Sequence, residues 1–199
     1  MTQFEKSHPK IKVSLKAGTS LEIEALVLDA SVELAIIADP LLSTLLEMEL
    51  FRKEILSVFV APDHPLARRK KIDAGELTAL PLIIKGGRNS RNWTDEFLRG
   101  LITTGLKPNV RMRLESPDSV KAAVRNGAGA GILYRDVIDV EVQRGMFKVL
   151  EVTGVDLTCS SYIVYSKEKP LSRSAQGFLT ILRAARETVA RIKGKAVTN

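Results

Sequence analysis

Strand-like and helix-like segments alternate along almost the whole 199-residue chain. Apolar runs bounded by turn residues predict strands at 34–37, 49–52, 55–61, 82–84, 110–114, 132–134, 147–150 and 158–165. Helices are predicted from 18–20 to 28, over 72–77, from 90–92 to 104, from 116 onward and from 172 onward, with a helical or turn segment at 136–144. Because strands and helices alternate, the pattern favours an α/β fold with mostly parallel sheets.

The first residues carry a different pattern. Ile11, Val13 and Leu15 alternate with lysine and serine residues, which predicts a half-buried strand near the N-terminus. Residues 1–16 lack the apolar core of a signal peptide, and no apolar run approaches the roughly 18 residues of a membrane span. Cys159 is the only cysteine, so no intramolecular disulfide can form, and we expect a reducing, cytoplasmic location.

The net charge of +7 and the pI near 9.6 bear on association rather than on fold. The densest basic run is 68–71, which we interpret as a solvated corner beside a turn; direct contact with nucleic acid is the weaker alternative. No aromatic residues are interleaved with this run, so a stacking platform for single strands is not expected. Steep salt dependence of DNA retention would support the DNA alternative.

Catalytic and metal-binding patterns are not found in the sequence. His8 and His64 are the only histidines, no zinc-type spacing exists, and no nucleophile–base arrangement is evident. The glycines at 127, 129 and 131 follow a predicted helix and precede a strand, the reverse of a dinucleotide-binding loop, so a helix stop with close packing is favoured. Cys159 lies in a predicted strand and is interpreted as a packed thiol rather than a redox sensor. We therefore expect no metal, no cofactor and no enzymatic activity.

Several motifs in order resemble the effector-binding domain of LysR-type transcription regulators. Residues 4–13 are similar to the end of the first helix and the second strand of that family, and Gly18-Thr19-Ser20 before a short helix also matches. Glu33 stands where the family usually has Asp. The segment 60–67, with His64-Pro65-Leu66, is the most distinctive match, and 115–134 resembles the family's helix, glycine-rich turn and strand. The resemblance extends from about residue 4 to residue 187.

This resemblance implies a two-lobed, periplasmic-binding-protein-like (type 2) fold. The expected regulatory lobe I comprises residues 1–84 plus 166–199, and lobe II comprises 85–165. The first strand and most of the first helix of lobe I are expected to be missing from this sequence, as is the DNA-binding winged helix-turn-helix. Family members pair side by side and antiparallel, which implies a homodimer formed through the predicted strand at 10–17 and nearby helices, and a tetramer in the full-length parent.

Helix starts suggest where a ligand binds. Ser20, Ser90, Ser116 and Ser119 fall at predicted helix N-termini, where free N–H groups and the helix dipole suit a carboxylate or phosphate, and Lys85, Arg88 and Arg91 add positive charge near Ser90. The alternative is that each serine only caps its own helix. With the positions that the resemblance implies for the cleft between lobes, the predicted ligand-binding residues are Gly18, Thr19, Ser20, Asp39, Lys85, Ser90, Ser116, Ser119 and Ile132.

The resemblance implies an allosteric sensor of a small metabolite, which we expect to be an organic acid. Binding would bias the arrangement of the lobes and act on DNA-binding heads outside this sequence. A solute-binding protein of a transport system shares the fold and is the alternative; the lack of a signal-peptide pattern and the His64-Pro65-Leu66 turn count against it. Neither a membrane partner nor a cofactor is expected.

Overall fold

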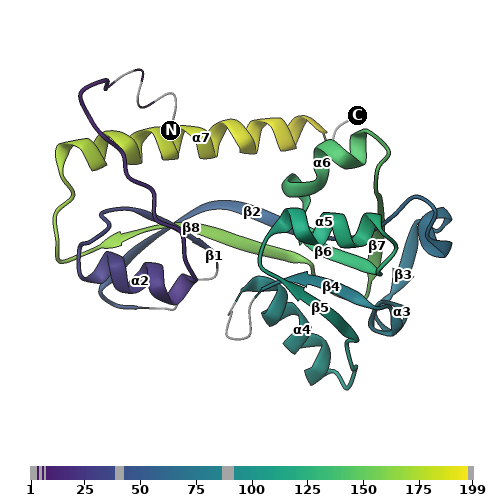
Figure 1. Ribbon diagram of the computed structural model, residues 1–199. Helices are drawn as coiled ribbons and strands as arrows, with labels where there is room; N and C mark the ends of the chain where they lie inside the picture. Colours follow the sequence, from purple (N-terminus) through teal and green to yellow (C-terminus); the bar gives the residue numbers. More distant parts are fainter. Residues whose placement is uncertain (1–3, 5, 7, 39–42, 87–91, 197–199) are drawn as a thin grey trace. The chain divides into compact units, whose positions relative to one another are not determined.

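The computed structural model describes residues 4, 6, 8–38, 43–86 and 92–196, with side chains through residue 186. Helices and strands alternate as predicted, so the α/β class is confirmed (Figure 1), but the strands pair both parallel and antiparallel rather than mostly parallel. The chain forms two compact units, residues 1–53 with 160–199 and residues 54–159. Two strands pass from one unit to the other, β2 (Leu46–Val60) and β8 (Thr158–Ser166).

Three parallel strands form the centre of the second unit. β4 (Leu82–Lys85) pairs in parallel with β5 (Val110–Leu114) on one side and with β6 (Ala130–Tyr134) on the other. Each strand precedes a helix: α4 (Trp93–Thr103), α5 (Pro117–Arg125) and α6 (Arg135–Gln143) respectively. The chain therefore passes from β4 outward to β5 and then returns across β4 to β6.

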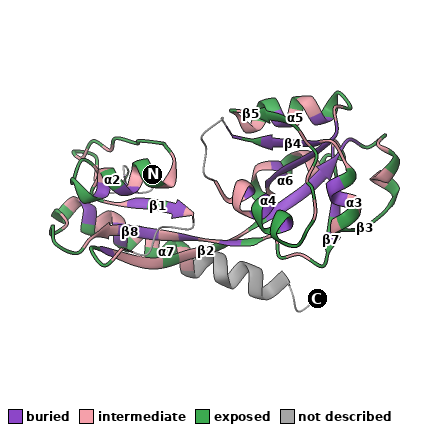
Figure 2. Cartoon of the chain, turned by 90° about the horizontal axis from the view of Figure 1, so that it is seen from below, coloured by how far each residue is buried: buried purple, intermediate pink, exposed green. Residues whose placement is uncertain are grey.

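This path places α4 and α5 on opposite faces of β4 (Figure 1). Leu82 and Ile84 share one apolar cluster with Phe97 and Leu101 of α4. Ile83 shares another with residues of α5 and α6. All three strand residues are fully buried, and Figure 2 shows β4 buried along most of its length while α5 is largely exposed on its outer side. A strand covered on both faces reads as a continuous apolar run, which is why 82–84 was recognisable in the sequence.

The remaining elements of the second unit border β2. The second half of β2 pairs antiparallel with β6 and, at Val58–Val60, with β7 (Lys148–Thr153), which also pairs in parallel with β3 (Lys71–Asp73). A 3-10 turn, η1 (Pro65–Arg68), and the helix α3 (Ala74–Ala79) lie between β2 and β4 in the chain. His64 caps η1, because its ring nitrogen accepts a hydrogen bond from the Leu66 N–H at 3.1 Å. The His-Pro-Leu sequence thus has a local structural role.

The first unit contains α2 (Ser20–Leu28), β1 (Ala35–Ala38) and the long C-terminal helix α7 (Arg173–Ala196). β1 pairs antiparallel with β8, and Val27, Ala35, Ile37, Leu46 and Val164 form the core. Phe4 is almost fully buried, and its ring packs edge-on against Phe178 of α7 at 5.1 Å between centroids.

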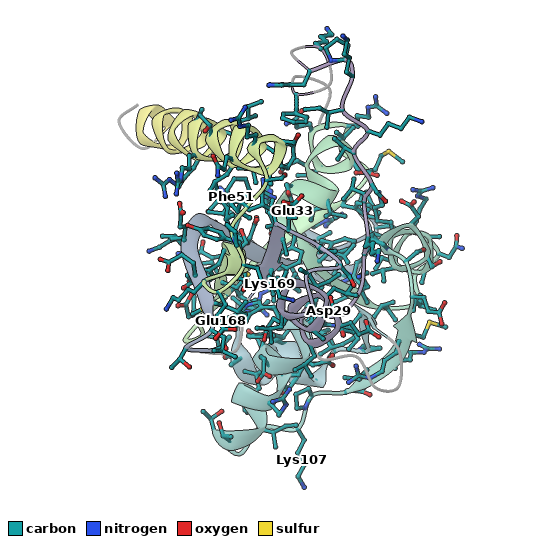
Figure 3. The ribbon with its side chains drawn as sticks, turned by 90° about the vertical axis from the view of Figure 1, so that its left-hand side faces the viewer. Asp29, Glu33, Phe51, Lys107, Glu168 and Lys169 are labelled. Carbon is teal, nitrogen blue, oxygen red and sulfur yellow. The ribbon has the colours of Figure 1, made fainter. Side chains whose placement is uncertain are left out.

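Charged side chains hold α7 in the first unit. Arg183 of α7 donates to the Glu49 carboxylate through Nε at 2.9 Å and through Nη2, and the Tyr165 hydroxyl donates to the same carboxylate at 2.9 Å. At the start of α7, the Ser172 N–H donates to Glu33 at 2.8 Å. Figure 3 shows Glu33 among the charged side chains of this unit.

The predicted strand at 10–17 is wrong. Residues 11–19 are described and form no strand, and the Leu15 side chain is 74% exposed. Alternation of apolar and polar residues produces a strand only where a neighbouring strand supplies hydrogen bonds. The segment 10–17 has no such neighbour, since β1, at the edge of the described sheet, pairs only with β8. The apolar pattern therefore remains in an extended segment that pairs with no described strand.

Other boundaries also differ from prediction. The predicted strands 49–52 and 55–61 are one continuous strand, β2, and the predicted helix 72–77 divides into β3 and α3. The units change at 53/54 and 159/160, whereas the resemblance implied 84/85 and 165/166. The reason is packing: Leu56, Val58, Ile72 and Leu77 share their core with Leu82 in the second unit, so residues 54–84 belong there.

Glycines at 129 and 131 make close contacts that no other residue permits. A Cβ at Gly129 would lie 2.0 Å from the Pro81 carbonyl oxygen, and the φ of Gly129 is +151°. A Cβ at Gly131 would lie 2.4 Å from the Phe59 ring. The Pro81 oxygen accepts the Ala130 N–H at 2.9 Å, so this contact fixes the register of β4 against β6. The glycine run serves close packing, as the sequence favoured.

Gly129→Ala is expected to destabilise the second unit by about 1–3 kcal/mol, because the new methyl group must push the two strands apart. Gly100→Ala is the matched control: Gly100 lies in α4, where a methyl group would meet no atom within 4 Å, and alanine favours a helix by about 1 kcal/mol over glycine. Urea denaturation measures both. An unchanged midpoint for Gly129→Ala would contradict the steric argument.

Stability of the first unit is expected to fall in acid through Glu49. The Arg183 guanidinium, assisted by the Tyr165 hydroxyl and opposed by burial, holds the pKa of Glu49 below its ordinary value of 4.5. Since the folded pKa is depressed, this carboxylate stabilises the fold above pH 4.5 and the contribution is lost as pH falls through the lowered pKa. Glu49→Gln should flatten the acid limb of a stability–pH profile. Glu168→Gln, at an exposed carboxylate (Figure 3), should leave that limb as it is in the parent.

Candidate functional site

The carboxyl ends of β4, β5 and β6 meet at one edge of the second unit's sheet. Because the three strands are parallel, Lys85, Leu114 and Tyr134 end at this edge, and the helices α4, α5 and α6 begin there. β4 and β6 lie on the two sides of the point where the chain reverses its direction across the sheet. In α/β folds, ligands bind at the carboxyl ends of strands beside such a reversal. This carboxyl edge is therefore the candidate site in the second unit.

Asn92 joins the end of β4 to the start of α4. Its Oδ1 accepts the Asp95 N–H at 3.1 Å, so it caps α4, and its Nδ2 donates to the Lys85 carbonyl oxygen at 3.1 Å. The sequence predicted a helix start at 90–92, and Asn92 was not among the predicted ligand-binding residues. Its position directly before the apolar stripe of α4 is the sequence signal that identifies it.

The start of α5 is closed by two serines. The Ser116 hydroxyl accepts the Ser119 N–H at 3.1 Å and lies 2.8 Å from the Ser119 hydroxyl. Ser116 is thus the N-cap that the sequence predicted, and Pro117 occupies the first turn. The structure brings Ser116 and Ser119 together at the carboxyl edge. In this arrangement the Ser116 hydroxyl caps its own helix, which is the structural alternative left open above.

Charge at the carboxyl edge is uneven. Lys85 is exposed and forms no ion pair with a described residue. Arg113 of β5 is neutralised by Asp95 of α4, and Lys121 of α5 by Asp118 and Glu141, whose hydrogen bonds raise the pKa of Lys121. Among the described cations of this edge, Lys85 is therefore the one that no described acid neutralises.

Tyr134 adds a polar group that the sequence did not single out. It ends β6 at the carboxyl edge and is only partly exposed. Burial, together with the neighbouring Cys159, raises the pKa of its hydroxyl above the ordinary value, and a tyrosine hydroxyl is protonated at neutral pH even without this shift, so it can donate a hydrogen bond. Its place at the end of a buried strand is the only sequence signal that could have suggested it.

The predicted residues of the first unit lie at the start of α2, where a capping box is already complete. Thr19 accepts the Glu22 N–H at 3.3 Å, and the Glu22 carboxylate accepts from the Thr19 N–H at 2.7 Å and from its hydroxyl at 2.9 Å. Gly18 permits this contact, since a Cβ there would lie 2.9 Å from Glu22 Oε2. The Thr19 N–H, at which a ligand was predicted, therefore already donates a hydrogen bond to a carboxylate of the chain itself.

Ser20 has a bond that joins two elements. Its hydroxyl donates to the Ala38 carbonyl oxygen at 3.0 Å, which ties the first residue of α2 to the last residue of β1. Ser20 therefore lies beside Ala38, the residue directly before Asp39 in the chain. Asp39 and Ser90, with Arg88 and Arg91, lie outside the described residues.

Ile132 is a core residue, and the prediction that it contacts a ligand is not supported by its position. Its side chain is fully buried among apolar residues. It lies within β6, opposite Val58 on one side and Ile84 on the other. The prediction was based on the family resemblance, which did not show that Ile132 lies in the middle strand of three paired strands.

Metal-ligating side chains do not cluster in the described part of the chain. It contains no group of three His, Cys, Asp or Glu residues placed to hold a metal ion. Cys159 is buried and forms no disulfide, as expected. Among these residues no helix has both the length and the apolar character needed to cross a membrane.

The architecture is a mixed α/β protein with the two-lobed, periplasmic-binding-protein-like fold. Residues 1–187 match the family model described as the LysR substrate binding domain, and the chain belongs to that family.

Relatives at the sequence level are regulators. The chain is 32% identical over 188 residues, 94% of its length, to the HTH-type transcriptional activator CmpR of Synechocystis sp. (strain ATCC 27184 / PCC 6803 / Kazusa). It is 29% identical over 180 residues, 90% of its length, to the HTH-type transcriptional regulator YeiE of Escherichia coli K12. The chain spans 61% and 60% of the lengths of these two relatives, respectively.

Solved structures share the fold. The regulatory domain of Synechocystis PCC6803 CcmR in complex with 2-PG has a TM-score of 0.82 at 24% identity, covering 93% of this chain and 88% of that one. The effector binding domain of QuiR in complex with shikimate has a TM-score of 0.77 at 20% identity, covering 94% and 88%.

Ser116→Ala should destabilise the second unit by about 1 kcal/mol through loss of the α5 cap. Ser116→Asn keeps a side chain that caps helices equally well, so its stability should match that of the parent. Ser119→Ala serves as a further comparison, because its N–H, the donor to the cap, is retained. Thermal denaturation of the three variants measures the differences, and equal melting of the alanine and asparagine variants at position 116 would show that the cap is energetically unimportant.

Proposed function

We propose that this chain senses a small carboxylate-bearing metabolite for a transcription regulator. The observation that carries the proposal is the carboxyl edge of the second unit, where Lys85, which pairs with no described acid, lies at the end of β4 and the helices α4 and α5 begin. A cation and helix N-termini together favour an anion. Family membership supplies the context, because LysR regulators bind small-molecule effectors.

The ligand class is supported by two related domains. The CcmR domain is in complex with 2-PG and the QuiR domain with shikimate, and both ligands are carboxylates. In this chain the ammonium group of Lys85 would pair with the acid, and Asn92, Ser116 and Tyr134 would supply hydrogen bonds to the rest of the ligand. The start of α2 is less suited than this edge, since Glu22 occupies it.

The regulatory output is assigned by the same proposal. Ligand binding would favour one of two conformations of the full-length protein and so act on a DNA-binding part outside this sequence. The protein would be cytoplasmic and would act as a sensor rather than an enzyme, in line with relatives that are transcription regulators. A homodimer fits the exposed apolar side chain of Leu15, in the segment 10–17 that the family resemblance implicates in pairing.

Transport is the alternative function for this fold. A solute-binding protein would use the same kind of site without any link to DNA. The family match and the relatives named above are regulators, so the transport alternative is not favoured.

A thermal-shift titration with a panel of small carboxylic acids tests the proposal. An effector at one hundred times its Kd should stabilise the protein by about 2.7 kcal/mol, because it binds only the folded state. Lys85→Met should weaken this shift by removing the charge partner. Lys107→Met is the matched control: Lys107 lies before β5, at the opposite end of that strand, and its side chain points away from the protein (Figure 3).

Ser116→Asp separates ligand binding from helix capping. Aspartate caps α5 as well as serine does, so the fold should keep its stability, while the added negative charge should repel an acid and abolish the shift. Cooperative melting with no response to any acid, or a response that neither Lys85→Met nor Ser116→Asp changes, would overturn the assignment of the site.

A further inference from the structure

The sheet of the second unit opens into a fork between β2 and β7. β7 pairs with β2 at Val58–Val60, but from Glu151 onward it pairs with β3 instead. The preceding residues of β2, Leu56 and Ser57, remain paired with β6 on their other side. Between the diverging strands lies a pocket of about 830 Å³, lined by residues 55–57, 67–70, 135, 148–152, 155 and 157. A pocket of this size is sufficient for a small organic ligand.

Positive charge surrounds this fork pocket. Five of the lining residues are cations and one is an acid: Arg68, Arg69, Lys70, Arg135, Lys148 and Glu151. Arg69 is paired with Glu76, Arg135 with Asp139, and Glu151 with Lys71. Arg68, Lys70 and Lys148 form no ion pair with a described residue, so three cations face solvent around one opening without a counter-charge from the described chain.

The walls between these cations are mainly apolar. Ile55, Val155 and Leu157 line the pocket, and Ile55 is 45% exposed although it belongs to a strand. Ser57 is only 5% exposed and also lines the pocket. An apolar wall with a few polar groups and a rim of one charge is the pattern of a site for an ion that carries an apolar body.

We propose that the fork pocket binds a small amphiphilic carboxylate, with its apolar body against Ile55, Val155 and Leu157 and its acid group among Arg68, Lys70 and Lys148. None of the residues proposed to bind the effector, Lys85, Asn92, Ser116 and Tyr134, lines this pocket, so it is a second site, and Arg135 alone of its lining directly follows one of them in the chain. Nucleic acid fits less well, because the wall between the cations is mainly apolar and no aromatic side chain lines the pocket to stack with bases.

Calorimetric titration with octanoate tests the proposal. Octanol probes the apolar contacts alone, and inorganic phosphate probes the charge contacts alone. Octanoate should bind saturably, and each of the other two at least about tenfold more weakly, since each lacks one set of contacts. Arg68→Gln with Lys148→Gln should weaken octanoate binding by about threefold to tenfold, the effect of two exposed charge contacts. Ile55→Ser should weaken it as well and, because Ile55 is half exposed, should leave the fold intact.

Lys107→Gln with Arg125→Gln is the matched control, since both residues are exposed cations of the second unit outside the pocket, and octanoate affinity should be unchanged. Lys85→Met should also leave it unchanged; if it abolishes octanoate binding, the acid occupies the carboxyl edge and the second site is refuted. Binding of phosphate as tight as that of octanoate, pocket variants without effect, or displacement of octanoate by duplex DNA would each overturn the proposal.

Discussion

Burial of β4 on both faces is the constraint on which the second unit depends. Its three apolar residues are fully buried between α4 on one face and the α5–α6 cluster on the other. Such a strand needs partners on both edges, and β5 and β6 supply them in parallel. Parallel pairing in turn places three carboxyl ends and three helix starts at one edge. The position of the candidate site is thus a consequence of how the core is covered, before any ligand-binding residue is considered.

The same burial explains what could be predicted from the sequence. Continuous apolar runs identified β4, β6 and most of the other strands, and Ser116-Pro117 located the start of α5. The segment 10–17 was not predictable, since its alternation is the pattern of a strand but pairing with a distant segment decides whether a strand forms. Similarly, the division of β2 between two units depends on which core Leu56 and Val58 join, which no local pattern reveals.

For the candidate site, the residue types at the helix starts were predictable from the sequence. The hydrogen bonds that these side chains already make within the chain were not. Serine and threonine at helix starts do lie where predicted, but Thr19, Ser20 and Ser116 already bond to the chain itself. Lys85 and Asn92 belong to the candidate site because of the strand order, which places the end of β4 between the ends of β5 and β6. The Ile132 side chain is fully buried, a depth within the sheet that a motif, which gives only a position along the chain, does not predict.

The capping box of α2 has a consequence for how that helix start meets an acid from solution. Glu22 is held only three residues from Thr19, and its pKa is lowered chiefly by the Thr19 N–H. A tethered group of this kind acts at an effective concentration of about millimolar or more. An external carboxylate must displace the Glu22 carboxylate before it can bind the Thr19 N–H. A carboxylate of similar affinity at a concentration well below this effective concentration therefore does not bind at the start of α2. An external acid therefore has a weaker apparent affinity for this helix start than for an uncapped one, whereas at the end of β4 Lys85 meets no described acid.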